Sequence, residues 1–311
     1  MDRTSITPDD IKRLAKDKGY VIIAHNYQIP DLQKIADIVG DSLQLAVHAT
    51  KINTGKILFL GVDFMAEMIK VLNPHKKVIV PDTSATCPMA ATLSREDILS
   101  AKDKYTAPFV AYVNSTLETK ALADLVCTSA NAVDVVSMME EDTVLFGPDK
   151  NLASFVREKT GKNIIPVPGE HGFCYVHDRV LLDEIRTIKM KHPDALIMAH
   201  PEVHEEIRRE SHFVGSTSQM EKYPEEADSE KFIVVTEIGM VEKLRNLHPG
   251  KEFFAVDSMV CTDMKLNSIG KTFSAISEER NEVFVDEELV GGARRAVERM
   301  FDLMRSFSVK K

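Results

Sequence analysis

VIIAHNYQ at residues 21–28 returns in altered form as FVAYVNST at 109–116 and as LIMAHPEV at 196–203. Each stretch is an apolar run of strand-forming residues that ends in alanine. A ring-bearing residue follows the alanine, and a polar residue lies two positions further on. These pairs are His25 and Tyr27, Tyr112 and Asn114, and His200 and Glu202. A pattern that returns at one interval indicates an internal repeat.

Further landmarks keep the same interval. Cys174 follows Cys87 by 87 positions, and Cys261 follows Cys174 by 87 again. A hydroxyl residue ends each of the segments IVGDS, LVCTS and FVGST, giving Ser42, Ser129 and Thr217. A third apolar run, ILFLG at 57–61, also has counterparts in both later copies. Several landmarks in one register make chance spacing of the cysteines an inadequate explanation.

Each copy alternates short apolar strands with helical stretches. The strands lack the apolar–polar alternation of a half-exposed sheet, which favours a parallel sheet covered on both faces. We therefore predict the α/β class, with three repeated three-layer αβα domains. Equivalent loops of the three repeats are expected to meet in a pseudo-threefold arrangement around a central active site.

The repeats predict the domain boundaries. The first domain covers residues 1–86, the second 87–173 and the third 174–269. Residues 270–311 do not form a fourth copy: we expect a loop, a break at Gly291–Gly292 and an amphipathic closing helix. This segment is predicted to pack back onto the first domain.

Composition bounds the function. The chain has 311 residues, of which 44% are hydrophobic and 28% are charged, and its formal net charge is −9. This balance is typical of a globular protein and argues against nucleic acid or an anionic membrane as a partner. No apolar stretch suggests a signal peptide or a membrane span, so a cytoplasmic location is expected. In that compartment cysteines favour metal or redox chemistry over structural disulfides.

Three cysteines at equivalent strand ends predict a metal site. Cys87, Cys174 and Cys261 would hold a [4Fe-4S] cluster with three protein ligands and leave one iron open to act as a Lewis acid. Cys127 aligns instead with Gly40 and Gly215 and is interpreted as a small packed residue. Zinc is an alternative, because Cys174 and His177 have ligand-like spacing. The other two cysteines have no such histidine, so His177 is interpreted as a helix-start residue.

The other landmarks suit a small anionic substrate. Helix starts at Ser42, Ser129 and Thr217 would offer N–H groups to a carboxylate or phosphate, although each hydroxyl could be only an N-cap. The side chains of the first landmark set supply proton donors and acceptors, and they are His25, Tyr27, Tyr112, His200 and Glu202.

At these residues the chain resembles quinolinate synthases along nearly its whole length. The matching pieces are AHNYQ at 24–28, GDSLQLA at 40–46, AYVNS at 111–115, AHPEV at 199–203, GSTSQM at 215–220 and CTDMKL at 261–266. The resemblance implies a transferase that condenses iminosuccinate (iminoaspartate) with dihydroxyacetone phosphate. The products are quinolinate, phosphate and water, in the de novo synthesis of NAD.

The resemblance also implies residue roles. One [4Fe-4S] cluster per chain would be bound by the three spaced cysteines. Catalytic residues would be Tyr27, Tyr112, His200 and Glu202. Substrate-binding residues would be His25, Ser42, Tyr112, Val113, Asn114, Ser129, His200, Pro201, Glu202 and Thr217. Functional coupling to an L-aspartate oxidase or dehydrogenase that produces iminosuccinate is a further expectation.

Two other functions remain open from the sequence. One is a radical enzyme of the diphthamide-forming kind, which also gathers one cysteine from each of three α/β domains but needs S-adenosylmethionine. The other is a non-catalytic iron–sulfur sensor. Such a sensor would have no reason to repeat the ring-bearing and hydroxyl landmarks.

Overall fold

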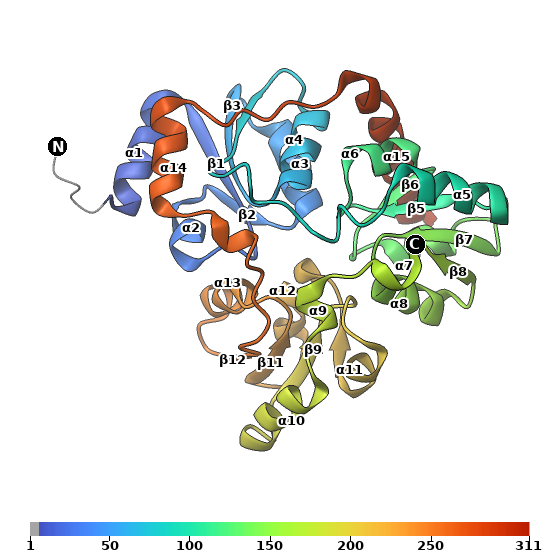
Figure 1. Cartoon of the computed structure of the whole chain (residues 1–311). Helices are drawn as coiled ribbons and strands as arrows, with labels where there is room; N and C mark the ends of the chain where they lie inside the picture. Colours follow the sequence, from blue (N-terminus) through green and yellow to red (C-terminus); the bar gives the residue numbers. More distant parts are fainter. Residues whose placement is uncertain (1–5, 311) are drawn as a thin grey trace. The chain divides into compact units, whose positions relative to one another are not determined.

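The computed structural model describes residues 6–310, apart from the side chains of residues 307–310. Its strands form three separate four-stranded sheets, and every pairing within them is parallel. The predicted α/β class and the three parallel sheets flanked by helices are therefore confirmed (Figure 1).

The first sheet has the strand order β2-β1-β3-β4. Its strands are β1 (Tyr20–His25), β2 (Ile38–Gly40), β3 (Lys56–Leu60) and β4 (Lys77–Ile79). The helices that accompany it are α1 (Pro8–Lys18), α2 (Pro30–Ile35), α3 (Ser42–Lys51), α4 (Asp63–Leu72) and α14 (Ile269–Glu278), with the 3-10 turn η2 (Met264–Leu266).

The second sheet repeats this order as β6-β5-β7-β8. Its strands are β5 (Phe109–Tyr112), β6 (Leu125–Cys127), β7 (Thr143–Gly147) and β8 (Asn163–Pro166). Its helices are α5 (Arg95–Tyr105), α6 (Leu117–Leu122), α7 (Ala132–Ser137), α8 (Lys150–Thr160) and α15 (Glu287–Lys310), with η1 (Gly169–His171).

The third sheet has the order β10-β9-β11-β12. Its strands are β9 (Leu196–Ala199), β10 (Phe213–Val214), β11 (Lys231–Val235) and β12 (Glu252–Ala255). Its helices are α9 (Tyr175–Asp178), α10 (Leu182–Lys191), α11 (Glu205–Glu210), α12 (Thr217–Glu226) and α13 (Gly239–Leu247). The same strand order three times is the structural counterpart of the sequence repeat.

Strand register supports the alignment of Cys127 with Gly40. In the first sheet His25 pairs with Gly40, and in the second Tyr112 pairs with Cys127. Cys127 thus lies at the carboxyl end of the edge strand β6, and its side chain is fully buried.

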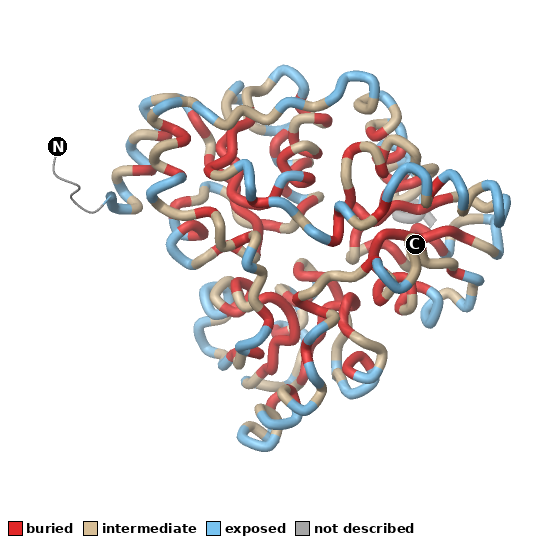
Figure 2. Tube along the Cα trace, viewed as in Figure 1, coloured by how far each residue is buried: buried red, intermediate tan, exposed pale blue. Residues whose placement is uncertain are grey.

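The chain forms two compact units. The first comprises residues 1–87 and 261–286, and the second comprises residues 88–260 and 287–311. The second unit therefore contains both the second and the third sheet. In the first unit Ile11, Ile22, Leu58 and Ile276 belong to one core between the sheet and its helices. Burial follows this layering, because the strands are buried and the outward helix faces are exposed (Figure 2).

The closing segment divides between the two units, whereas the sequence assigned all of it to the first repeat. Helix α14 lies against α1, and α15 packs on α6 and β6 of the second repeat. The expected Gly-Gly break is also wrong, because α15 runs unbroken from Glu287 to Lys310. Gly292 marks a close approach instead: a Cβ there would lie 2.7 Å from the carbonyl oxygen of Ala121 on α6. Within residues 6–310 no helix has the length and apolar character needed to span a bilayer.

Candidate active site

The loop after the first strand of each sheet carries the ring-bearing residues. We call residues 25–28, 112–115 and 200–203 the strand-end loops. His25 is the last residue of β1 and accepts a hydrogen bond at Nδ1 from the backbone N–H of Tyr27, at 3.2 Å. His200 follows β9 and accepts in the same way from the N–H of Glu202, at 3.4 Å. Two repeats therefore hold their imidazole with the same local contact.

Glu202 is the centre of a buried acid–base cluster in the second unit. Its side chain is only 2% exposed, and its Oε2 lies 2.8 Å from His177 Nδ1 and 3.6 Å from His200 Nδ1. The hydroxyl of Tyr112 also hydrogen-bonds the carboxylate. Among the described residues, the other oxygen, Oε1, is buried without a hydrogen-bond partner. The strand-end loops of the second and third repeats thus meet at one carboxylate.

The electrostatics of this cluster keep Glu202 ionised. Burial alone raises the pKa of Glu202, but His200, His177 and the hydrogen bonds from His177 and Tyr112 together lower it to about 2. Asp149 responds in the opposite direction. Burial and the nearby charge of Glu202 raise the pKa of Asp149 well above its ordinary value.

His200 is neutral in this environment. Burial lowers its pKa to about 3, with the neighbouring His177 acting in the same direction and Glu202 opposing both. Because Nδ1 accepts a hydrogen bond from the Glu202 N–H, the ring proton belongs on Nε2. Nε2 lies 3.3 Å from Ser129 Oγ and donates to it. A hydroxyl landmark and a ring landmark therefore lie side by side.

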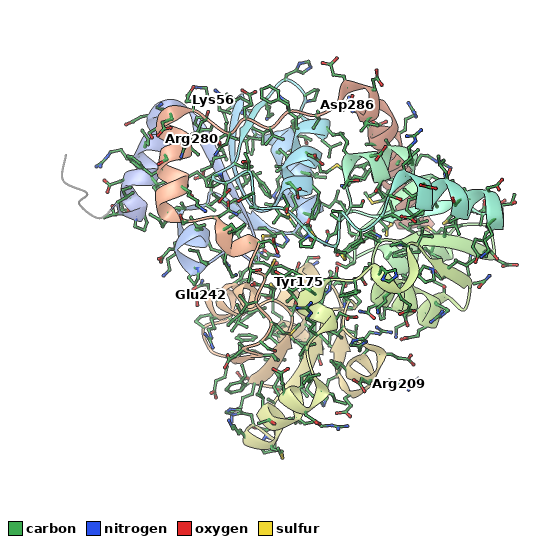
Figure 3. The ribbon with its side chains drawn as sticks, in the orientation of Figure 1. Lys56, Tyr175, Arg209, Glu242, Arg280 and Asp286 are labelled. Atoms are coloured by element: carbon green, nitrogen blue, oxygen red, sulfur yellow. The ribbon has the colours of Figure 1, made fainter. Side chains whose placement is uncertain are left out.

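His177 joins this cluster to Cys174, which goes beyond the helix-start role that the sequence suggested for it. Its Nδ1 lies 3.3 Å from Cys174 Sγ, and its Nε2 lies 2.9 Å from Thr236 Oγ1. Tyr175, labelled in Figure 3, begins the short helix α9 that carries His177 toward Cys174. The sulfur, nitrogen and carboxylate ligand atoms of Cys174, His177 and Glu202 lie within 4.8 Å of one another and could hold a metal ion. The Cys-x-x-His spacing was the available signal.

The cysteine loops are anchored identically in the three repeats. An N–H at the start of the helix that follows the third strand donates to the carbonyl two positions before the cysteine. The pairs are Asp63 to Ala85 at 2.9 Å, Lys150 to Gly172 at 2.8 Å and Ile238 to Met259 at 2.9 Å. This contact fixes the backbone that leads into each cysteine.

A carboxylate adds a second anchor in two repeats. Asp63 Oδ1 accepts from the N–H of Cys87 at 3.2 Å, and Asp149 Oδ2 accepts from the N–H of Cys174 at 3.0 Å. Cys87, Cys174 and Cys261 are half-buried. Cys127 differs, because complete burial raises the pKa of its thiol and keeps it protonated. The sequence offered no sign of Asp149. Its acidic counterpart in the first repeat is Asp63, and the spacing between these two residues differs by one position from the spacing between the cysteines.

The hydroxyl landmarks lie at or near helix starts. Ser42 and Thr217 are the first residues of α3 and α12, and the N-caps are their neighbours Asp41 and Ser216. Ser129 lies in the turn before α7. Of the remaining predicted positions, Val113 and Pro201 are buried and Asn114 is half-buried.

In the first unit, the Tyr27 loop and the segment after Cys261 contact each other. Lys265 Nζ donates to the carbonyl oxygen of Tyr27 at 2.5 Å, and Gln28 Nε2 lies 3.5 Å from Met264 Sδ. The CTDMKL motif thus supports the first strand-end loop.

Parallel α/β repeats with an ionised carboxylate, a neutral imidazole and a thiol at strand ends define the class: an α/β enzyme with acid–base chemistry at its loops. The family described as "Quinolinate synthetase A protein" matches residues 9–302. A quinolinate synthase of Thermotoga maritima is 52% identical over 297 residues, which cover 95% of this chain and 99% of that protein. A quinolinate synthase of Pyrococcus furiosus is 45% identical over 305 residues, covering 97% and 100%.

The chain therefore belongs to the quinolinate synthase family. The resemblance stated from the sequence is confirmed. Membership of this family also makes the chain an enzyme, which sets aside the non-catalytic iron–sulfur sensor.

Proposed function

We propose that this chain forms quinolinate from iminosuccinate and dihydroxyacetone phosphate, with release of phosphate and water, in the synthesis of NAD. The observation that carries the proposal is the ionised, buried Glu202 between His177, His200 and Tyr112. Condensation and ring closure both need protons moved at defined atoms, and this cluster provides an acceptor beside neutral donors. The names of the relatives support the same product.

We further propose that Cys87, Cys174 and Cys261 bind one [4Fe-4S] cluster. The residues fit that group, because the three half-buried thiols follow equivalent strands and their loops share one backbone anchor. When bound, a cluster with three protein thiolates supplies an iron that can act as a Lewis acid toward an oxygen. The nearness of His177 and Glu202 to Cys174 supports a role for them in proton transfer beside one of the proposed ligands.

Glu202 and the residues around it have different roles in proton transfer. Glu202 begins each cycle without a proton, because its pKa lies far below neutral pH, and so it acts as the base. His200 is neutral and serves as a hydrogen-bond donor through Nε2, with Ser129 holding the ring in that orientation. Tyr112 donates to Glu202 and orients its carboxylate. Tyr27, on the first strand-end loop, is proposed as a further acid–base residue.

Anion binding is proposed for the hydroxyl landmarks. Ser42 and Thr217 occupy the first position of ten-residue helices, where backbone N–H groups point outward and the helix dipole favours negative charge. Substrate contacts are also proposed for His25, Val113, Asn114 and Pro201. Since iminosuccinate is unstable, coupling to an L-aspartate oxidase or dehydrogenase that produces it is part of the proposal.

The function is tested with protein purified without oxygen. Iminosuccinate generated in the assay and dihydroxyacetone phosphate are supplied together, and quinolinate is measured by chromatography. We expect quinolinate only when both substrates are present. Iron-loaded protein that forms none under these conditions would overturn the proposed function.

A further inference from the structure

Each repeat has a buried side-chain donor that binds its own strand-end loop. Gln33 Nε2 donates to the carbonyl oxygen of Gln28 at 2.9 Å, and Lys120 Nζ donates to the carbonyl oxygen of Ser115. Arg208 Nη1 donates to the carbonyl oxygen of Val203 at 2.6 Å. The separation between donor and acceptor is five residues in all three.

The three donors come from equivalent helices. Gln33 lies on α2, Lys120 on α6 and Arg208 on α11, the helix that follows the first strand of each sheet. Their acceptors end the strand-end loops at equivalent positions. Two of the donors also bind the carbonyl two residues earlier in the loop, since Gln33 reaches Asn26 O at 3.0 Å and Arg208 reaches Pro201 O at 3.4 Å.

Burial of these side chains is costly and needs an explanation. Lys120 is 1% exposed, Arg208 is 5% exposed and Gln33 is 8% exposed. Lysine and arginine are almost never buried unless their charge is met by partners. The guanidinium of Arg208 also pairs with Glu158. The contact that all three repeats share is the hydrogen bond from the buried donor to the loop.

We propose that Gln33, Lys120 and Arg208 are positioning residues that hold the three strand-end loops in their reactive conformation. This deepens the proposed function, because the loops carry Tyr27, Tyr112 and Glu202. Tying the last carbonyl of a loop to the following helix fixes the backbone between strand end and helix start. Preorganisation of this kind matters, since a displacement of 1 Å at a reacting group can cost roughly a hundredfold in rate.

The donors share a function without sharing a residue type. Gln, Lys and Arg have in common only an N–H group at the end of a long side chain. The equivalence of the three donors is therefore recognised from their hydrogen bonds and burial, and not from their residue types. It also predicts that one type can replace another if the reach is sufficient, and Gln33 shows that a glutamine spans the required distance.

The second repeat gives the sharpest test. Lys120→Met removes the donor at similar size, whereas Lys120→Gln keeps a donor of the kind that serves in the first repeat. The matched control is Lys102→Met, because Lys102 also donates to a carbonyl, that of Leu122 at 2.9 Å, and pairs with Asp124. Leu122 is the last residue of α6, and Asp124 accepts from the N–H of Phe109. This control therefore acts at the far end of α6 and at the amino end of β5, and makes no contact with the loop carbonyl of Ser115.

Two readouts are measured on the iron-loaded proteins. Hydrogen–deuterium exchange of residues 112–116 reports the loop, where the N–H groups of Val113 and Ser115 are hydrogen-bonded. Steady-state kinetics separate kcat from KM. For Lys120→Met we expect loop exchange about tenfold faster or more and kcat lower by about ten- to a hundredfold, with a smaller change in KM. Lys120→Gln should restore both, and Lys102→Met should match the wild type in both.

The outcomes distinguish this inference from the proposed function. Unchanged loop exchange and kcat in Lys120→Met would overturn the positioning role, as would failure of Lys120→Gln to restore them in a folded protein. If Lys120→Met does not fold, Gln33→Met provides the same comparison for residues 25–28 with no buried charge removed. The exchange measurement does not depend on quinolinate formation. The positioning role can therefore be tested even if the proposed function is wrong.

Discussion

Glu202 combines two properties that seldom occur together, namely nearly complete burial and a stable negative charge. Desolvation opposes the charge, and the donors around it overcome that cost. Hydrogen bonds from His177 and Tyr112 contribute to this. A carboxylate held in this way is a preorganised acceptor, because its donors do not have to reorient when it receives a proton.

Replacement of Glu202 tests this residue. Glu202→Gln keeps the size and removes the charge, and we expect kcat to fall by about a hundredfold or more with iron content unchanged. Glu205→Gln is the control, since Glu205 lies three residues away on α11 in an exposed pair with Arg209 and should behave as wild type. Turnover of Glu202→Gln near that of Glu205→Gln would remove Glu202 from the mechanism.

Tyr20 gives a pH-dependent prediction away from the site. Its hydroxyl is buried without a hydrogen-bond partner among the described residues. Burial, with smaller effects of Glu279 and Glu282, raises the pKa of Tyr20 to about 12, from 10.0. The folded state thus prefers the protonated form. The stability that depends on this preference is complete below pH 10 and is lost as the pH rises toward 12.

Tyr20→Phe should therefore reduce the alkaline loss of stability. At neutral pH the variant should be equal to the wild type, or more stable by up to about 1 kcal/mol, because no hydrogen bond is broken. Urea unfolding at a series of pH values measures both effects. An identical decline between pH 10 and 12 in the two proteins would contradict the assignment.

At the scale of elements, α15 shows how one glycine can decide packing. Two glycines in sequence suggested a break, yet the helix continues through both. Gly292 faces α6, where a Cβ would also lie 3.1 Å from the Cα of Ala121. Gly291 has only the flexible end of Arg295 near it, at 3.5 Å. Contact between α15 and α6 offsets the low helix propensity of glycine at Gly292. No such contact offsets it at Gly291.

The two glycines form a matched pair of variants. Gly292→Ala should lower the free energy of unfolding by about 1–3 kcal/mol, because backbone atoms of α6 must move. Gly291→Ala should raise it by up to about 1 kcal/mol through helix propensity. Denaturant unfolding measures both values. Equal effects of the two substitutions would show that α15 does not depend on this close approach.

Much of the element pattern could be predicted because apolar strands and helix stretches are local features. The four-strand succession of each repeat follows from such runs, and even the two-residue β10 falls within a predicted landmark at 213–217. Contacts that depend on side-chain reach could not be predicted. His177 was not predicted as a site residue, because the other two cysteines have no histidine three positions later. Asp149 was not predicted because its distance in sequence from the cysteines matches no known metal-binding motif.

At the scale of the whole molecule, the repeat is seen most clearly in hydrogen bonds. Three strand orders match, three cysteine loops share a backbone anchor, and three buried donors bind their strand-end loops. Compact units do not follow the repeats one to one, because the second and third repeats lie in one unit. Tyr112 and Glu202 provide one contact between the loops of those two repeats.

Three equivalent cysteines are proposed to hold the cluster, and Cys127 serves as their internal control. Cys127 is fully buried at the end of an edge strand, where the first repeat has Gly40. Its replacement by alanine should cost on the order of 1 kcal/mol of stability at most and leave the metal site intact.

The most direct measurement is the iron content, with quinolinate formation, of four single variants prepared without oxygen. Cys87→Ala, Cys174→Ala and Cys261→Ala each leave two thiolates for the cluster. We predict that these three are folded, nearly colourless and inactive, while Cys127→Ala keeps wild-type iron and activity. Full iron in any one of the first three variants, or loss of iron in Cys127→Ala, would contradict the account.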